Sequence, residues 1–305
     1  MVERDKNFVR IIKNISHTNH AMLVISFDSV FSLAFCRRVV KEILVLNNRQ
    51  DLATKLDHGS YVDIFEIEGK NSIKVADIMP IIEKSAETGI ESDFKFYIIK
   101  NAEKLTIEAQ NKLLKTLEEP NKNQFYFLCV PSRFLILPTI ASRCSTIELE
   151  PNNKKEIETF LAQNGADPIK AKEDAELSLG SIEKATADQT KSDSFVVALG
   201  ALTQIFGSAD TAEHAAKIQK SNIEQVVEYL EQLLLDAIKL KFDCQDIWFE
   251  SYKEKLIKLK TCSASGLLFI YKQIQKIKSN AKVNVSPVIL ADKIALAIAE
   301  GKNKK

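Results

Sequence analysis

Apolar residues recur over the first 150 positions in five short runs, which are separated by amphipathic segments. The runs are AMLVISF (21–27), VDIFEIE (62–68), FKFYIIK (94–100), QFYFLCV (124–130) and STIELE (145–150). Short runs rich in β-branched and aromatic residues are typical of strands. The intervening patterns predict helices over 30–46, 72–87, 106–119 and 132–142. This alternation predicts a parallel five-stranded sheet covered on both faces, with FYIIK in an interior strand.

After Pro151 the pattern has a helical period and no further strand is predicted. A small helical unit is expected over 151–187, and the polar stretch ADQTKSDS (187–194) is interpreted as a linker. Long amphipathic helices are then predicted over 223–242, 263–279 and 286–301. The predicted fold class is therefore α/β plus all-α, with a sheet domain at 1–150, a helical lid at 151–187 and a helical domain at 188–305.

Composition narrows the function classes without identifying one. A net charge of +1 offers no global attraction to nucleic acid, so such contacts require a local patch. The five cysteines form no CxxC pair and the four histidines have no ligand spacing, which argues against a metal site. The charged start MVERDKNFVR does not resemble a signal peptide, and no apolar run reaches the roughly 18 residues of a membrane span. We expect a cytoplasmic protein with reduced thiols.

Arginine is rare in this chain, and one arginine stands in a notable place. Only seven of the 42 basic residues are arginines. Arg143 lies between Ser142 and Cys144 in the stretch TIASRCSTIEL. Lysine serves solubility equally well, whereas a planar guanidinium can contact a phosphate through two N–H groups at once. Arg143 is therefore a candidate phosphate-contacting residue.

Two adjoining stretches, AQNKLLKTLEEP (109–120) and FYFLCVPSRFLILPTIASRC (125–144), resemble bacterial clamp-loader subunits of DNA polymerase III, which belong to the AAA+ superfamily. In that family a helix reading NALLKTLEEP precedes a sensor strand and an LPTIxSRC segment that ends in an arginine finger. The resemblance is specific over about 35 residues and architectural beyond about 185. It implies an AAA+ type sheet domain, a helical lid and a helical collar through which subunits form a ring.

The position that corresponds to the family's phosphate-binding loop departs from the pattern. A P-loop needs glycines, a lysine and a Ser/Thr that holds Mg²⁺. Here the region reads ISFDSVFSLAFCRRVV, the first glycine of the chain is Gly59, and no GKS or GKT occurs. Phe27, Val30 and Phe31 are expected to occupy the space that a triphosphate requires. We therefore predict that ATP does not bind in the ordinary way and that no cofactor is held.

The other nucleotide-contacting positions implied by the resemblance are also altered. Where family ATPases have Asp-Glu to hold Mg²⁺, this chain has Lys100 and Asn101. The first sensor position falls at Cys129 and Val130, and the lid arginine is replaced by Lys184. The zinc module of many relatives is absent, because residues 40–62 contain no cysteine.

The resemblance thus implies a subunit that does not hydrolyse ATP but keeps the arginine finger. Arg143 would act in trans on a neighbour's ATP, with Ser142 and Cys144 in positional roles. The implied partners are gamma/tau-type ATPase subunits, a delta-type clamp-opening subunit, the sliding clamp and primed DNA. Two alternatives stay open: a divergent gamma/tau-type ATPase, and a scaffold in which the arginine is a relic.

Several other basic residues are candidates for DNA or interface contacts. Clamp loaders follow the duplex backbone through positive charge rather than by reading bases. A solvated surface position is the competing interpretation for each of the candidates. They are Arg133, Lys112, Lys115, Arg37 and Arg38.

Overall fold

The computed structural model describes residues 20–69, 71–186, 190–205, 211–281 and 286–304. The chain divides into two compact units. The first comprises Met1–Ile157 with Gly180–Glu183, and the second comprises Glu158–Leu179 with Lys184–Lys305. The bounds of the three predicted domains remain a prediction. The N-terminal stretch MVERDKNFVR and His17 lie outside the described residues.

The first unit is built on a parallel sheet of five strands in the order β2-β3-β4-β1-β5. β1 pairs with β4 in parallel, with Ala21 opposite Tyr126 at one end and Ile25 opposite Val130 at the other. β3 lies between β2 and β4, which confirms that FYIIK is in an interior strand. The strands are β1 (Ala21–Ile25), β2 (Ile64–Glu68), β3 (Lys95–Lys100), β4 (Gln124–Val130) and β5 (Ser145–Glu148).

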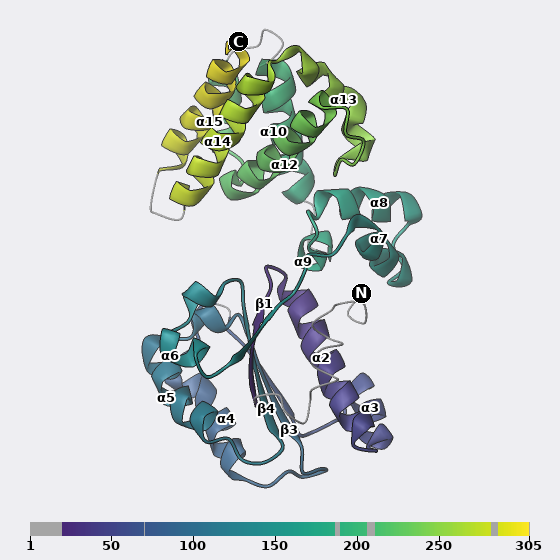
Figure 1. Cartoon of the computed structure of the whole chain (residues 1–305), viewed down its shortest axis with the longest axis vertical. Helices are drawn as coiled ribbons and strands as arrows, with labels where there is room; N and C mark the ends of the chain where they lie inside the picture. The colour runs from purple at the N-terminus through teal and green to yellow at the C-terminus, as the bar shows by residue number, and fades with distance from the viewer. Residues whose placement is uncertain (1–19, 70, 187–189, 206–210, 282–285, 305) are drawn as a thin grey trace. The chain divides into compact units, whose positions relative to one another are not determined.

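Helices cover both faces of this sheet, as the sequence predicts (Figure 1). Alternate strand residues point to opposite faces, so Phe96 and Tyr97 belong to different cores. α2 (Ser29–Leu46) and α3 (Gln50–Asp57) cover one face. The other face carries α4 (Val75–Ala86), η3 (Ala102–Lys104), α5 (Ile107–Glu118) and α6 (Pro138–Ala141). The short η4 (Arg133–Leu135), between β4 and α6, buries none of its residues.

Two details of this unit differ from the prediction. The helix α3 was not predicted, because it has only eight residues and buries only Leu52 and Ala53. The segment 132–142 is not one helix but the short turn η4 followed by α6. Pro138 stands at the first position of α6, where its missing N–H disrupts no helical hydrogen bond.

The second unit contains helices and no strand among its described residues. α12 supplies much of its core through Leu230, Leu233 and Leu234, which are fully buried. The predicted long helices are present as α12, α14 and α15. The helices after β5 are α7 (Lys154–Gln163), α8 (Pro168–Leu177), α9 (Ile182–Thr186), α10 (Thr190–Ile205), α11 (Thr211–Gln219), α12 (Ile223–Lys241), η5 (Glu250–Tyr252), α13 (Lys253–Ile257), η6 (Lys258–Thr261), α14 (Ala264–Ala281) and α15 (Pro287–Lys302).

The linker prediction for 187–194 is wrong over its second half. Residues 187–189 lie outside the described part, but 190–194 form the first turns of α10. Ser194 is buried, and its hydroxyl donates to Oε1 of Gln225 at 3.1 Å. A buried polar side chain with a hydrogen-bond partner can thus belong to a helix that the local composition does not suggest. No helix in the described ranges is long and apolar enough to cross a bilayer.

Candidate functional site

Arg143 lies in the short connection between α6 and β5. Its Nη1 donates to the carbonyl oxygen of Thr139 at 2.7 Å, and its Nη2 forms an ion pair with Oε1 of Glu118. The arginine side chain nevertheless remains 35% exposed. Among the described residues, Nε and the second N–H groups of Nη1 and Nη2 have no other partner. The guanidinium is therefore anchored on its own chain and can still donate to a group from outside.

Ser142 and Cys144 shape the segment that carries this arginine. The hydroxyl of Ser142 donates to the carbonyl oxygen of Thr139 at 3.1 Å. The backbone N–H of Ser142 donates to the carbonyl oxygen of Pro138 at 2.9 Å. Cys144 is buried at the start of β5, and this burial raises the pKa of its thiol to about 12. The thiol therefore stays protonated and unreactive near neutral pH.

The position of Arg143 relative to the sheet limits what it can contact. β5 runs parallel to β1, with Ser145 opposite Met22. Arg143 precedes Ser145, so it lies at the edge where the strands begin. The N-terminus of α2 follows β1 and lies at the edge where the strands end. Strand residues rise about 3.3 Å each, so the edges are roughly 15 Å apart, farther than an arginine side chain extends.

The N-terminus of α2 is where a parallel sheet of this type would receive a phosphate. Here the buried carboxylate of Asp28 accepts the N–H groups of Val30 and Phe31, each at 3.0 Å through Oδ1. Its Oδ2 accepts the N–H of Ile182 at 2.5 Å. The chain's own carboxylate therefore occupies the helix N–H groups that would otherwise bind an anion.

A second carboxylate completes this arrangement. Oε2 of Glu183 accepts the N–H of Ser29 at 3.2 Å and its hydroxyl at 2.8 Å. The prediction that aromatic side chains occupy the space of a triphosphate is met only in part, because Phe27 is 86% exposed whereas Phe31 packs in the core. Two carboxylates, rather than aromatic rings, thus occupy the donors of the α2 N-terminus.

Two of the other positions that the family resemblance relates to nucleotide contact hold lysines paired with acids of the chain. Lys100, at the end of β3, pairs with Glu68 at 2.8 Å. Lys184 pairs with Glu228 of α12 at 2.5 Å. In the described part of the chain, no cluster of three or more His, Cys, Asp or Glu side chains could hold a metal ion.

The other predicted contact residues are spread over different surfaces. Arg37 forms a two-point ion pair with Glu66 at 2.6 and 2.8 Å, and this bond raises the arginine pKa. Arg38 pairs with Glu42 at 2.7 Å. Both arginines are thus bound to acids of the same chain, and a DNA contact through either one stays a prediction. Arg133, Lys112 and Lys115 are exposed and form no ion pair among the described residues, and Arg133 follows β4 at the sheet edge opposite Arg143.

Sequence reasoning missed three acidic residues at these sites. Asp28 stands before an apolar helix, where aspartate is a favoured N-cap, so this signal was available. Glu183 contacts Ser29 across 154 positions of sequence, and only the fold brings the two together. The partnership of Glu118 with Arg143 likewise depends on the packing of α5 against α6.

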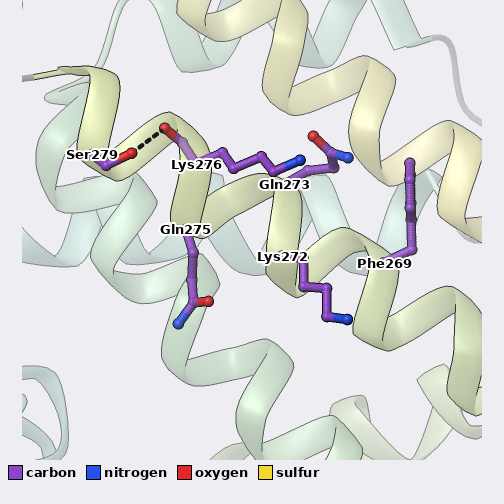
Figure 2. Close-up of a pocket in the computed structure, with 6 residues that line it drawn as sticks. All are labelled: Phe269, Lys272, Gln273, Gln275, Lys276 and Ser279. Atoms are coloured by element: carbon purple, nitrogen blue, oxygen red, sulfur yellow. Dashed lines mark hydrogen bonds between the residues drawn. The ribbon is translucent and has the colours of Figure 1, made fainter.

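A shallow pocket in the second unit does not qualify as a ligand site. Figure 2 shows its lining residues, which all belong to α14 and spread along the helix without converging on one point. The hydrogen bond between Ser279 and the carbonyl of Lys276 stays within the helix. A small-molecule site requires polar groups that converge on an enclosed cavity. The lining residues are Phe269, Lys272, Gln273, Gln275, Lys276 and Ser279.

Comparisons with known proteins agree on one family. The family model described as DNA polymerase III, delta subunit matches residues 4–153, and its C-terminal counterpart matches residues 197–288. The DNA polymerase III subunit delta' of Bacillus subtilis is 31% identical over 73% of this chain and 60% of its own length. The corresponding subunit of Haemophilus influenzae is 27% identical over 73% of this chain and 69% of its own length.

Two further similarities are more distant. The gamma subunit of Buchnera aphidicola from Acyrthosiphon pisum is 29% identical over 51% of this chain and 46% of its own length. The structure of a gamma subunit-related protein from Thermotoga maritima has 18% identity and a TM-score of 0.42 over 98% of this chain and 100% of that one. That structural likeness is too weak to support an argument. Both matched family models together span more than half of the sequence, and the chain belongs to the DNA polymerase III delta subunit family that these models describe.

Proposed function

We propose that this chain is the delta-prime subunit of a DNA polymerase III clamp loader, a subunit that binds no ATP itself. In this role it supplies Arg143 to the ATP held by a neighbouring gamma/tau-type subunit. The similarity to delta-prime proteins supports the assignment to the complex. The local geometry of Arg143 and Asp28 supports the division of roles within it.

The observation that carries the proposal is where Arg143 lies relative to the N-terminus of α2, the position that corresponds to the family's phosphate-binding loop. Arg143 lies at the beginning of β5, whereas the α2 N-terminus lies beyond the end of β1. The donors at the α2 N-terminus are already bound by Asp28 and Glu183. A phosphate contact by Arg143 therefore requires a nucleotide from another subunit.

The chemistry of such a contact follows from the charge that develops when the γ-phosphate is transferred. An anchored guanidinium stabilises this charge through N–H donors whose orientation is set before the reaction. Arginine fingers in comparable enzymes accelerate phosphoryl transfer by about 10³- to 10⁵-fold. The subunit thus couples its neighbour's ATP hydrolysis to loading of the sliding clamp on primed DNA.

The other partners follow from the same assignment. The helical region 188–305 would hold the chain in a ring with gamma/tau-type and delta-type subunits. Arg133, Lys112 and Lys115 are the exposed basic residues from which DNA contacts would come. Such contacts would be to phosphates and would weaken as salt increases.

The first experiment measures ATP binding by the isolated chain and its incorporation into a ring. Equilibrium dialysis with Mg²⁺-ATP is expected to show no saturable binding, because two carboxylates and Lys100 occupy the site. Size-exclusion chromatography with gamma/tau-type and delta-type subunits is expected to show one complex. Saturable ATP binding would instead favour the divergent ATPase, and failure to join the complex would refute the clamp-loader assignment.

A further inference from the structure

Resting on the proposed function, we propose that Glu118 is a positioning residue for Arg143. Glu118 is the last residue of α5 and comes from a different element than the arginine that it binds. With the carbonyl of Thr139, it gives the guanidinium two anchors on its own chain. The pair sets the direction from which Arg143 reaches the neighbour's γ-phosphate.

The place of Glu118 in its helix is unfavourable without such a partner. The C-terminal end of a helix carries partial negative charge, which repels a carboxylate by roughly 0.3–1 kcal/mol. Glu118 and Glu119 both stand at this end of α5. The guanidinium of Arg143 offsets that repulsion by pairing with one of the two. Helix stability alone gives no reason for an acid here, whereas fixing a cation does.

The contact orients the arginine without using all of its donors. Glu118 binds Nη2 through one oxygen, and Thr139 binds Nη1. A guanidinium that bridges two fixed acceptors has lost most of its rotational freedom before a phosphate arrives. Because Nε and one further N–H on each terminal nitrogen remain, a phosphate oxygen pair can still be bound. Glu118 thus prepares the finger rather than competing with the phosphate.

The adjacent Glu119 provides a matched control. It is exposed, carries the same charge and makes no side-chain ion pair among the described residues. Replacing either acid with alanine changes the net charge equally. Any difference between Glu118→Ala and Glu119→Ala therefore reports the contact with Arg143 and not the local potential.

The test is a double-substitution cycle in the reconstituted ring, read as clamp- and DNA-stimulated ATP turnover. Glu118→Ala is expected to lower kcat about tenfold with KM for ATP unchanged, because only the transition state loses a positioned donor. Glu119→Ala is expected to leave both constants unchanged. In an Arg143→Ala background, Glu118→Ala should have no further effect. Thermal unfolding and ring assembly are compared for every variant.

The outcomes separate this inference from the proposed function. If Arg143→Ala alone leaves turnover unchanged, the trans-acting arginine is refuted, and the positioning role with it. If Arg143→Ala lowers turnover but Glu118→Ala does not, only the positioning role is refuted. Faster turnover with Glu118→Ala would show that the acid restrains the arginine. A further loss in the Arg143→Ala background would show that Glu118 acts by another route.

Discussion

Arg143→Ala is expected to lower ATP turnover at the neighbouring site by about 10³-fold, the lower end of the range for arginine fingers. In the proposed role the guanidinium acts on charge that develops only in the transition state, so ATP binding to the ring should change little. The measurement is steady-state turnover of the reconstituted loader with the clamp and primed DNA. Wild-type and variant rings are matched for assembly beforehand.

Two comparisons sharpen this prediction. Arg143→Lys keeps the charge but loses the two-point geometry, so it should recover only a small part of the rate. Arg49→Ala serves as the control, because Arg49 binds the carbonyl of Glu91 at 3.1 Å within its own chain. Unchanged turnover with Arg143→Ala in a normally assembled ring would leave this chain as a scaffold.

Asp28→Ala is expected to destabilise the first unit by about 2–4 kcal/mol. The change removes the N-cap of α2 and leaves the buried N–H of Ile182 without its acceptor. Asp28 is only 5% exposed, so water replaces the lost contacts poorly. The measurement is amide exchange in β1 at increasing urea concentrations, which reports unfolding of this unit.

Thr106→Ala is the matched control for Asp28→Ala. Thr106 caps α5 in the same unit but accepts only one backbone N–H, that of Ala109 at 3.2 Å. Its loss should cost about 1 kcal/mol. An equal effect of the two substitutions would contradict the account of Asp28 as a buried anchor. Asp28→Ala is not expected to create ATP binding, because position 100 still holds a lysine paired with Glu68 rather than a metal-binding carboxylate.

The sheet and the placement of Arg143 were predictable because local patterns encode them. Alternating apolar runs such as FYIIK determine strands that must be buried on both faces, and α5 begins and ends near Thr106 and Pro120. The stretch around Arg143 was specific enough to identify a family. These features depend only on residues that are close together in the chain, so a single sequence is enough to predict them.

The features that were missed depend on contacts between distant segments. Glu183 reaches Ser29 across 154 positions, and the sequence around either residue gives no sign of the other. The polar stretch ADQTKSDS predicts a linker at the start of α10, although Ser194 is buried and its hydroxyl donates to Gln225. Of the two carboxylates that occupy the donors at the α2 N-terminus, Asp28 could be recognised from the sequence as an N-cap, whereas Glu183 could not.

The most direct test of the central claim counts transition-state analogues bound by the ring. ADP with aluminium fluoride mimics the transferring phosphoryl group and is held tightly only where the charge-stabilising donors are present. Rings that contain Arg143→Ala are expected to retain one analogue molecule fewer than wild-type rings, with ATP binding unchanged. Equal numbers in both rings would contradict the assignment of Arg143 as a donor to the neighbour's nucleotide.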